Sequence, residues 1–307
     1  MLRITVFTPT YNRAYTLPRL YESLKAQTFH DFEWVIVDDG SADNTAEIVR
    51  GFIQERPFFE IKYRKTENGG KHRAINRGMD MVSGEMTYFV DSDDYLPVAA
   101  LALIDDVEKS ISDDVKKNFA GVCGLKCYNH GEVVGKTFDG EYMDITTLER
   151  NRYHIFGDRA EVFYTSVLKG YPFPEIDGEK FVTESLVWDR MAFDGYKLRF
   201  FNENVYQCEY LDDGLTSQGL KLYASNPIQW AKSIVQDRKF GKVQGNALSI
   251  QYYKYYLWEK DRFTRREMAV LLEMSRLNLA ATIIFQRTCD TLRGLLGQRR
   301  IMDDKCN

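Results

Sequence analysis

The sequence has little of what marks membrane-spanning, secreted or nucleic-acid-binding proteins. Its 307 residues include 7 prolines, 4 histidines and 5 cysteines. No run approaches the roughly 18 consecutive apolar residues that a membrane-spanning helix needs. An odd number of mostly distant cysteines indicates neither a disulfide framework nor a zinc site. The formal net charge is -4, so the chain as a whole has no attraction for nucleic-acid phosphate.

The N-terminus leads directly into a strand-like run, Ile4 to Phe7, without the apolar core of a signal peptide. We therefore expect a cytoplasmic protein. At about 100 to 200 residues per domain, the length predicts one large domain or a domain with an appendage.

Residues 1 to about 127 alternate short apolar runs with amphipathic segments, the pattern of βαβ units around a mostly parallel sheet. Strands are expected at 4–8, 33–37, 61–63 and 87–90, and helices from Thr16, from about Asn44, at 71–82 and at 99–109. Polar loops follow the second and fourth strands, at the edge where open α/β sheets bind ligands.

The second half of the chain has a more mixed pattern. Strands are expected near 119–127 and 197–210, with a helix near 184–193. From about residue 220 onward strand signals vanish and helical ones dominate, which predicts a helical appendage.

Three clustered carboxylates, Asp91, Asp93 and Asp94, directly follow an apolar strand. Carboxylates this close raise one another's pKa unless a cation or several hydrogen-bond donors compensate. Hard oxygen ligands of this kind suit Mg²⁺ or Mn²⁺ shared with a substrate diphosphate. The alternative is an ordinary turn with solvated aspartates.

Lys71, His72 and Arg73 occupy the first turn of a predicted helix, where the helix dipole favours negative charge instead. A bound anion would resolve this conflict, and the preceding Asn68-Gly69-Gly70 would let the backbone approach it. The alternative is that the long side chains simply extend into solvent.

Several motifs, in this order and spacing, resemble the family 2 inverting nucleotide-sugar glycosyltransferases with the GT-A fold. The motifs are Thr8 to Arg13, Val37 to Ser41 with Asp43 and Thr45, Asn68 to Gly70, Asn76 to Gly78, Ser83 to Glu85, and Asp91 to Asp94. The resemblance covers about the first hundred residues. It implies an α/β GT-A type nucleotide-diphospho-sugar transferase fold, a Rossmann-like mixed sheet, with the C-terminal helical appendage.

The resemblance also implies a division of the chain. Residues 1–219 would form the catalytic domain, in which 1–100 hold the nucleotide-sugar and the metal and 101–219 hold the acceptor. Residues 220–307 would form the helical region.

The resemblance implies a role for each matching residue in the donor site. Thr8, Pro9 and Tyr11 would line the nucleotide pocket, and Asp39 would read the base, expected to be uracil. Lys71 would lie near the pyrophosphate, in agreement with the dipole argument.

The acidic cluster would contact the ribose and the metal ion. The resemblance implies that Asp91 contacts the ribose or a metal-bound water and that Asp93 ligates the Mn²⁺ or Mg²⁺ bridging the phosphates. The Gly-Gly-Lys-His of residues 69–72 departs from the Gly-Val-Ser-x-Ala pattern common in the family, which leaves the individual phosphate contacts open.

Inversion needs a carboxylate that accepts the proton of the acceptor hydroxyl. Enzymes of this type usually carry an adjacent Glu-Asp pair before a helix, but here Ser185 follows Glu184. We choose Glu184 as the base, with Asp189 as the substitute. The alternative for Glu184 is structural, because an acid in a first helical turn is favoured by the dipole.

The sequence thus predicts transfer of a hexose or N-acetylhexosamine from a UDP-sugar to a saccharide or lipid-linked saccharide acceptor, in surface polysaccharide synthesis. A nucleotidyltransferase would also use carboxylates and a parallel sheet, but would need a glycine-rich phosphate loop after the first strand. A non-catalytic carbohydrate-binding protein would not need the three aspartates.

Apolar residues of the appendage, among them Leu277, Ile284 and Phe285, precede the basic residues Arg287 and Arg293, with Arg299 and Arg300 further on. Apolar anchors beside basic residues suit peripheral binding to the inner face of the cytoplasmic membrane. The alternative is that this face packs onto the catalytic domain.

Overall fold

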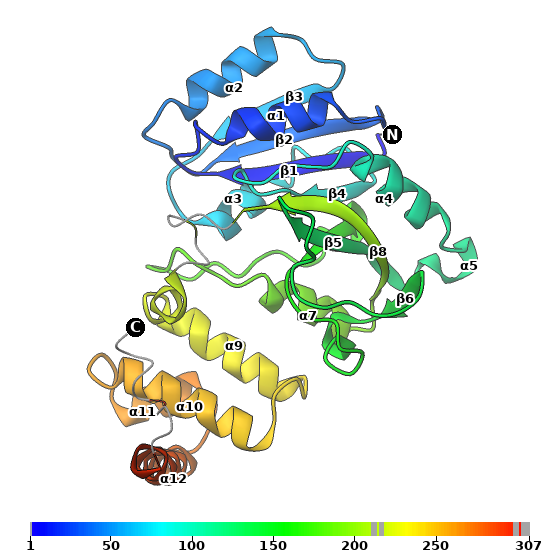
Figure 1. The fold of residues 1–307 in the computed structure, drawn as a ribbon. Helices are drawn as coiled ribbons and strands as arrows, with labels where there is room; N and C mark the ends of the chain where they lie inside the picture. Colours follow the sequence, from blue (N-terminus) through cyan, green and yellow to red (C-terminus); the bar gives the residue numbers. More distant parts are fainter. Residues whose placement is uncertain (1, 210–213, 215–217, 297–300, 302–307) are drawn as a thin grey trace. The chain divides into compact units, whose positions relative to one another are not determined.

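A computed structural model describes residues 2–209, 214, 218–296 and 301, in which the chain forms two compact units (Figure 1). Unit 1 comprises Met1–Glu175 and Val187–Asp212, and unit 2 comprises Ile176–Leu186 and Asp213–Asn307. The division into residues 1–219 and 220–307 remains a prediction. Arg299 and Arg300 lie outside the described residues.

The first part of unit 1 is the predicted succession of βαβ units. Its strands are parallel neighbours in the order β3-β2-β1-β4. Their right-handed connections place α1 and α2 on one face of the sheet and α3 on the other (Figure 1). The elements are β1 (Ile4–Thr10), α1 (Leu17–Lys25), β2 (Phe32–Asp38), α2 (Thr45–Gln54), β3 (Glu60–Lys65), α3 (Lys71–Gly78) and β4 (Met86–Phe89).

Helix α3 is shorter than the predicted 71–82. It ends at Gly78, and the chain then turns, with the N–H of Met81 donating to the Gly78 carbonyl at 2.9 Å. A Cβ at position 78 would lie 2.5 Å from side-chain atoms of Phe7 and Val37. Only glycine therefore lets α3 approach the sheet this closely.

The second part of unit 1 extends the sheet and makes it mixed. The full order is β3-β2-β1-β4-β7-β5-β8-β6, and β7 is antiparallel to both of its neighbours. The sequence did not predict β6 or β7, since β6 is short and the buried part of β7 begins with Arg159. The elements are α4 (Ala100–Lys109), α5 (Asp113–Lys116), β5 (Phe119–Tyr128), β6 (Tyr142–Ile145), a 3-10 turn (Thr147–Glu149), β7 (Arg159–Tyr164), α6 (Thr165–Leu168), α7 (Ser185–Phe193) and β8 (Lys197–Cys208).

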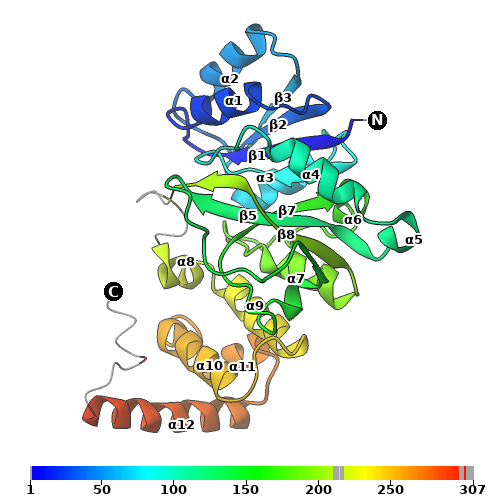
Figure 2. The same cartoon turned by 45° about the vertical axis from the view of Figure 1, so that its right-hand side comes forward.

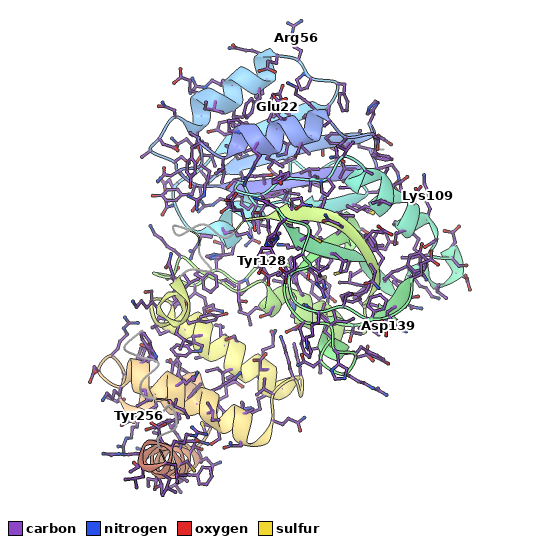
Figure 3. All side chains as sticks on the ribbon, viewed as in Figure 1. Glu22, Arg56, Lys109, Tyr128, Asp139 and Tyr256 are labelled. Carbon is purple, nitrogen blue, oxygen red and sulfur yellow. The ribbon has the colours of Figure 1, made fainter. Side chains whose placement is uncertain are left out.

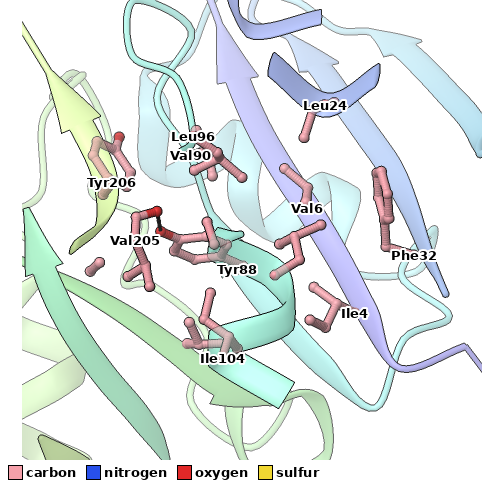
Figure 4. Close-up of a cluster of buried hydrophobic side chains, with 14 of the residues drawn as sticks. Ile4, Val6, Leu24, Phe32, Tyr88, Val90, Leu96, Ile104, Val205 and Tyr206 are labelled. Atoms are coloured by element: carbon pink, nitrogen blue, oxygen red, sulfur yellow. Dashed lines mark hydrogen bonds between the residues drawn. The ribbon is translucent and has the colours of Figure 1, made fainter. Parts of the chain in front are cut away.

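One apolar core joins the two parts of unit 1 (Figure 4). Its central side chain is Tyr88 of β4, which is fully buried among aliphatic residues of β1, α4 and β8. The Tyr88 hydroxyl donates to the carbonyl of Val205 at 2.9 Å, so its polar atom is satisfied inside the core. Charged residues such as Glu22 on α1 and Lys109 on α4 lie on the outside (Figure 3).

Unit 2 is helical throughout its described elements, as the sequence predicts. Helix α9 begins at Pro227, and the carboxylate of Glu179 accepts hydrogen bonds from the N–H groups of Ile228 and Gln229 at its N-terminus. The helices are α8 (Leu220–Ala224), α9 (Pro227–Lys239), α10 (Gly245–Glu259), α11 (Arg265–Leu271) and α12 (Arg276–Leu295), the last seen side-on in Figure 2. In the part of the chain that is described, no single helix is long and apolar enough to cross a membrane, whereas α11 and α12, bent by 104°, pass that test only together.

Candidate functional site

The predicted donor-site residues gather at the carboxyl edge of the parallel strands β1, β2 and β4. The loops after β1 and β2 are bound to each other, because the N–H of Asn12 donates to Ser41 Oγ and the N–H of Ala42 donates to Asn12 Oδ1, both at 2.8 Å. The N–H of Asp39 donates to the Thr10 carbonyl at the same distance. Residues some thirty positions apart therefore form one polar surface.

The three residues of the first motif have different environments. The Thr8 hydroxyl is buried and accepts a hydrogen bond from Trp34 Nε1 at 3.0 Å. Pro9 is also buried within β1. Tyr11 is 48% exposed, so its ring is the one that can stack on a ligand.

The carboxylate of Asp39 is buried and binds the loop before α3. Its Oδ1 accepts from the N–H of Gly69 at 2.8 Å, and its Oδ2 accepts from the N–H of Gly70 at 2.7 Å and from Asn68 Nδ2 at 3.1 Å. Gly70 has a φ of 100°, a conformation that favours glycine. The anion bound by the N–H groups of this loop is thus a side chain of the protein. The sequence suggested instead that the loop backbone approaches a bound anion.

Lys71, the first residue of α3, forms an ion pair with Asp91. Its Nζ lies 2.6 Å from Asp91 Oδ1. Burial alone would raise the pKa of Asp91, but the charges of Lys71 and Lys126 outweigh burial and hold that pKa below its usual value. Asp91 is therefore ionised and already compensated by the protein.

Asp93 and Asp94 are compensated less well than Asp91. Burial, followed by repulsion from Asp91, raises the pKa of Asp93, and Arg13 approaches its carboxylate only to 3.8 Å. The same two causes raise the pKa of Asp94 to about 7. The Asp94 carboxylate accepts from the N–H of Glu209 at 3.2 Å. The cluster therefore holds more negative charge than its surroundings neutralise.

A divalent cation would fit the Asp93 side of this cluster. Among the described residues no group of three or more His, Cys, Asp or Glu side chains is arranged to hold a metal by itself. Mg²⁺ needs no such cage, since it is commonly bound by one or two carboxylates together with substrate phosphates and water. The raised pKa of Asp93 is the sign of a carboxylate that gains from a nearby positive charge.

The structure adds residues that the sequence reasoning missed. The Tyr206 hydroxyl accepts from the N–H of Asp91 at 2.9 Å, and Lys126 Nζ lies 4.2 Å from the centre of the Tyr206 ring. Arg19 donates to the carbonyl of Asp93. Arg13 lies inside a motif already noted, but no local signal marks Lys126 or Tyr206, which reach the site through β5 and β8.

His72, next to Lys71, points away from solvent. It is 2% exposed, and neither ring nitrogen has a hydrogen-bond partner among the described residues. Burial, followed by the charge of Arg73, lowers the pKa of His72 to about 4, so the ring is neutral at pH 7. Of the basic residues in this turn, Lys71 is the one directed to the acidic cluster.

The two candidate bases lie in different surroundings. Glu184 immediately precedes α7, in the segment assigned to unit 2, and is half-buried. Asp189 lies within α7 in unit 1, is 3% exposed and accepts a hydrogen bond from Thr147 Oγ1 at 2.8 Å. Glu184 is the more accessible of the two carboxylates.

Comparison with known proteins finds a family match in the first part of the chain. Residues 5–109, which span β1 to α4 and all the motifs of the donor site, match the sequence model for glycosyl transferase family 2. Residues 5–109 are thus a glycosyl transferase family 2 domain. The resemblance drawn from the motifs is thereby confirmed.

Two relatives and one solved structure extend the family match. The chain is 27% identical over 196 residues to the GalNAc(5)-diNAcBac-PP-undecaprenol beta-1,3-glucosyltransferase of Campylobacter jejuni, covering 61% of this chain and 59% of that one. It is 27% identical over 234 residues to glycosyltransferase GlyA of Streptococcus pneumoniae, covering 76% of this chain and 30% of that one. The chain thus spans less than two thirds of either relative.

The solved structure confirms the fold. Residues 1–349 of S. aureus TarS, crystallised in complex with UDP-GlcNAc, align with a TM-score of 0.55 at 21% identity, over 88% of this chain and 75% of that one. The α/β mixed sheet predicted from the sequence is therefore the GT-A fold of these glycosyltransferases.

Proposed function

We propose that this family 2 protein is a metal-dependent inverting glycosyltransferase that uses a UDP-sugar donor, a UDP-hexose or UDP-N-acetylhexosamine. The observation that carries the proposal is the arrangement of Lys71, Asp91 and Asp93 at the carboxyl edge of the sheet. Lys71 lies 2.6 Å from Asp91, while Asp93 has a raised pKa. A cationic group and an undercompensated carboxylate side by side suit a metal-bound diphosphate.

The nucleotide would be bound by the ends of β1 and β2. The exposed ring of Tyr11 offers a stacking surface for the base, and Thr8 and Pro9, both buried in β1, would form the floor of the pocket. Asp39 accepts three hydrogen bonds from the loop before α3. It would orient that loop and read the base together.

The diphosphate and the metal would lie between Lys71 and Asp93. When bound, Mn²⁺ or Mg²⁺ would neutralise the charge that develops on the departing diphosphate. Lys71 would donate to a phosphate oxygen, and Asp93 would supply the protein ligand to the ion. Asp91, kept ionised by Lys71, would accept a hydrogen bond from the ribose or from a metal-bound water.

Glu184 is proposed as the general base. In an inverting transfer the acceptor oxygen forms its bond to the anomeric carbon as the bond from that carbon to the diphosphate breaks, and the hydroxyl proton passes to a carboxylate. A base must be reached by the acceptor, which favours the half-buried Glu184 over the buried Asp189. Asp189 would instead hold the 3-10 turn through Thr147.

The acceptor is proposed to be a saccharide, free or carried on a lipid, in surface polysaccharide synthesis on the cytoplasmic side of the membrane. The name of the Campylobacter jejuni relative includes an undecaprenol-linked saccharide, which supports a lipid-linked acceptor. An enzyme that uses such an acceptor benefits from peripheral association with the membrane.

Turnover with a panel of UDP-, GDP- and dTDP-sugars, each with and without Mn²⁺, tests the proposal. We expect release of UDP from a UDP-sugar, and loss of that release in excess chelator. Full activity in chelator would remove the metal from the proposal. Sugar binding without any metal-dependent UDP binding would favour a carbohydrate-binding protein, and release of pyrophosphate would favour a nucleotidyltransferase.

A further inference from the structure

Helix α12 has polar side chains on its buried face. Gln286 and Asp290 are buried there together with Leu279 and Ile283. Gln286 Nε2 donates to Asn246 Oδ1 at 2.7 Å and to Ser249 Oγ at 2.9 Å, both on α10. Asp290 accepts a hydrogen bond from the backbone N–H of Ile301. These bonds fix which face of α12 is turned inward, because breaking them would leave buried polar groups unpaired.

The opposite face of α12 is apolar and exposed. Its large side chains are between 53% and 82% exposed. Their separations of mainly three, four, seven and eight positions place them on one side of a helix. We call this set the outer stripe; it consists of Leu277, Ile284, Phe285, Leu292, Leu295 and Leu296.

The exposed charged residues of α12 are positive. Asp290 is the single acidic residue in the sequence of α12, and it is buried. Arg276 and Arg287 on the same helix are exposed. A contiguous apolar surface of this kind marks an interaction site, and its basic border selects a partner with negative charge.

We propose that the outer stripe binds an anionic lipid bilayer, with α12 lying along the surface. The leucines, Ile284 and Phe285 would enter the boundary between head groups and acyl chains, and Arg276 and Arg287 would contact lipid phosphates. A second copy of the chain would bring the same sign of charge to the contact, which makes it the poorer partner. The inference rests on the proposed function, which places the acceptor on a lipid carrier, and it names the surface and the lipid class.

Co-sedimentation of the full chain with vesicles tests this assignment. The vesicles contain phosphatidylcholine with about a third phosphatidylglycerol, or phosphatidylcholine alone, in about 0.05 M and about 0.5 M NaCl. The test variant is Ile284→Asp with Leu295→Asp. The matched control is Ile53→Asp with Val115→Asp, two exposed apolar residues of unit 1 (41% and 39%).

We expect the wild type and the control to bind anionic vesicles at low salt. The affinity of the test variant for these vesicles should be lower by about tenfold or by a larger factor. UDP affinity, measured by calorimetry, stays equal in all three proteins. Loss of UDP binding would therefore count against the proposed donor site and not against the membrane surface. Absence of wild-type binding, or equal loss in the control, overturns the inference. If the wild type is a dimer that does not bind lipid, and the test variant is a monomer, the outer stripe binds a second copy of the chain. That result also overturns the inference.

Discussion

Lys71 Nζ lies 2.6 Å from Asp91 Oδ1, which joins the start of α3 to the end of β4. The two side chains are 28% and 33% exposed, so the pair is partly solvated and contributes little to stability. An arriving diphosphate can therefore draw Lys71 toward itself at small cost. The pair keeps the lysine near the place where the resemblance puts the phosphates.

Replacing Lys71 by alanine should weaken the binding of UDP more than the binding of uridine, because the lost charge acts on the diphosphate. We expect UDP affinity to fall about tenfold, or roughly 1.4 kcal/mol, with uridine affinity nearly unchanged. Calorimetry with both ligands measures the difference, and Lys117→Ala, at an exposed position, is the control. Equal losses for the two ligands would mean that Lys71 acts through folding.

Asp93→Asn should reduce metal-dependent turnover by about 100-fold or more while leaving the fold intact. The folded protein already disfavours the ionised form of Asp93, since burial and Asp91 raise its pKa. Removing that charge should thus keep or slightly increase the melting temperature. Turnover with Mn²⁺ and thermal denaturation are compared with those of Asp31→Asn, an exposed control. Wild-type rates in Asp93→Asn would exclude the metal role.

Glu184→Gln should retain donor affinity and lose turnover, because an amide keeps the shape of the side chain but cannot accept the proton. Asp189→Asn should keep turnover within about threefold, since its amide oxygen can still accept from Thr147. Pre-steady-state rates and UDP affinities of both variants decide between them. The opposite pattern would identify Asp189 as the base.

Asp39→Asn should destabilise the protein by about 1–3 kcal/mol, because the amide nitrogen would face one of the two backbone N–H groups that now donate to the carboxylate. Urea denaturation measures this loss, again against Asp31→Asn. If Asp39 only reads the base, the substitution would weaken uridine binding without any change in the free energy of unfolding.

Asp94→Asn should change how stability depends on pH. The pKa of Asp94 is raised from 3.8 to about 7 in the fold, so its protonated form is the one the fold favours. Its contribution to stability is present below about pH 4 and is lost as the pH rises through about 7. Relative to the variant, the metal-free wild type should lose on the order of 4 kcal/mol between these limits. Parallel unfolding curves of the two proteins across this range would contradict the raised pKa.

Much of unit 1 could be predicted from local sequence. The strands β1, β2 and β4 are nearly continuous apolar runs with polar loops behind them, and α1 shows a clear apolar face. Such signals involve neighbouring residues only. The donor-site motifs are equally local, so the family and the fold class followed from about a hundred residues.

Other features depend on which distant segments meet. Strand β7 was missed because Arg159 at its buried start hides the strand pattern, although its guanidinium is satisfied by carbonyls of Val134 and Lys136. Lys126 and Tyr206 join the acidic cluster only because β5 and β8 are neighbours in the sheet. Neither pairing leaves a trace in the sequence nearby.

Local sequence patterns give the order of strands and loops, and that order is enough to predict carboxylates and basic residues at one edge of a parallel sheet. Local patterns do not show that the glycine loop before α3 binds Asp39, that Lys71 compensates Asp91, or that α12 turns Gln286 and Asp290 inward. The reason is physical: a charge or a buried polar group is stabilised by whichever partner lies within hydrogen-bond distance, and that partner is brought there by the fold.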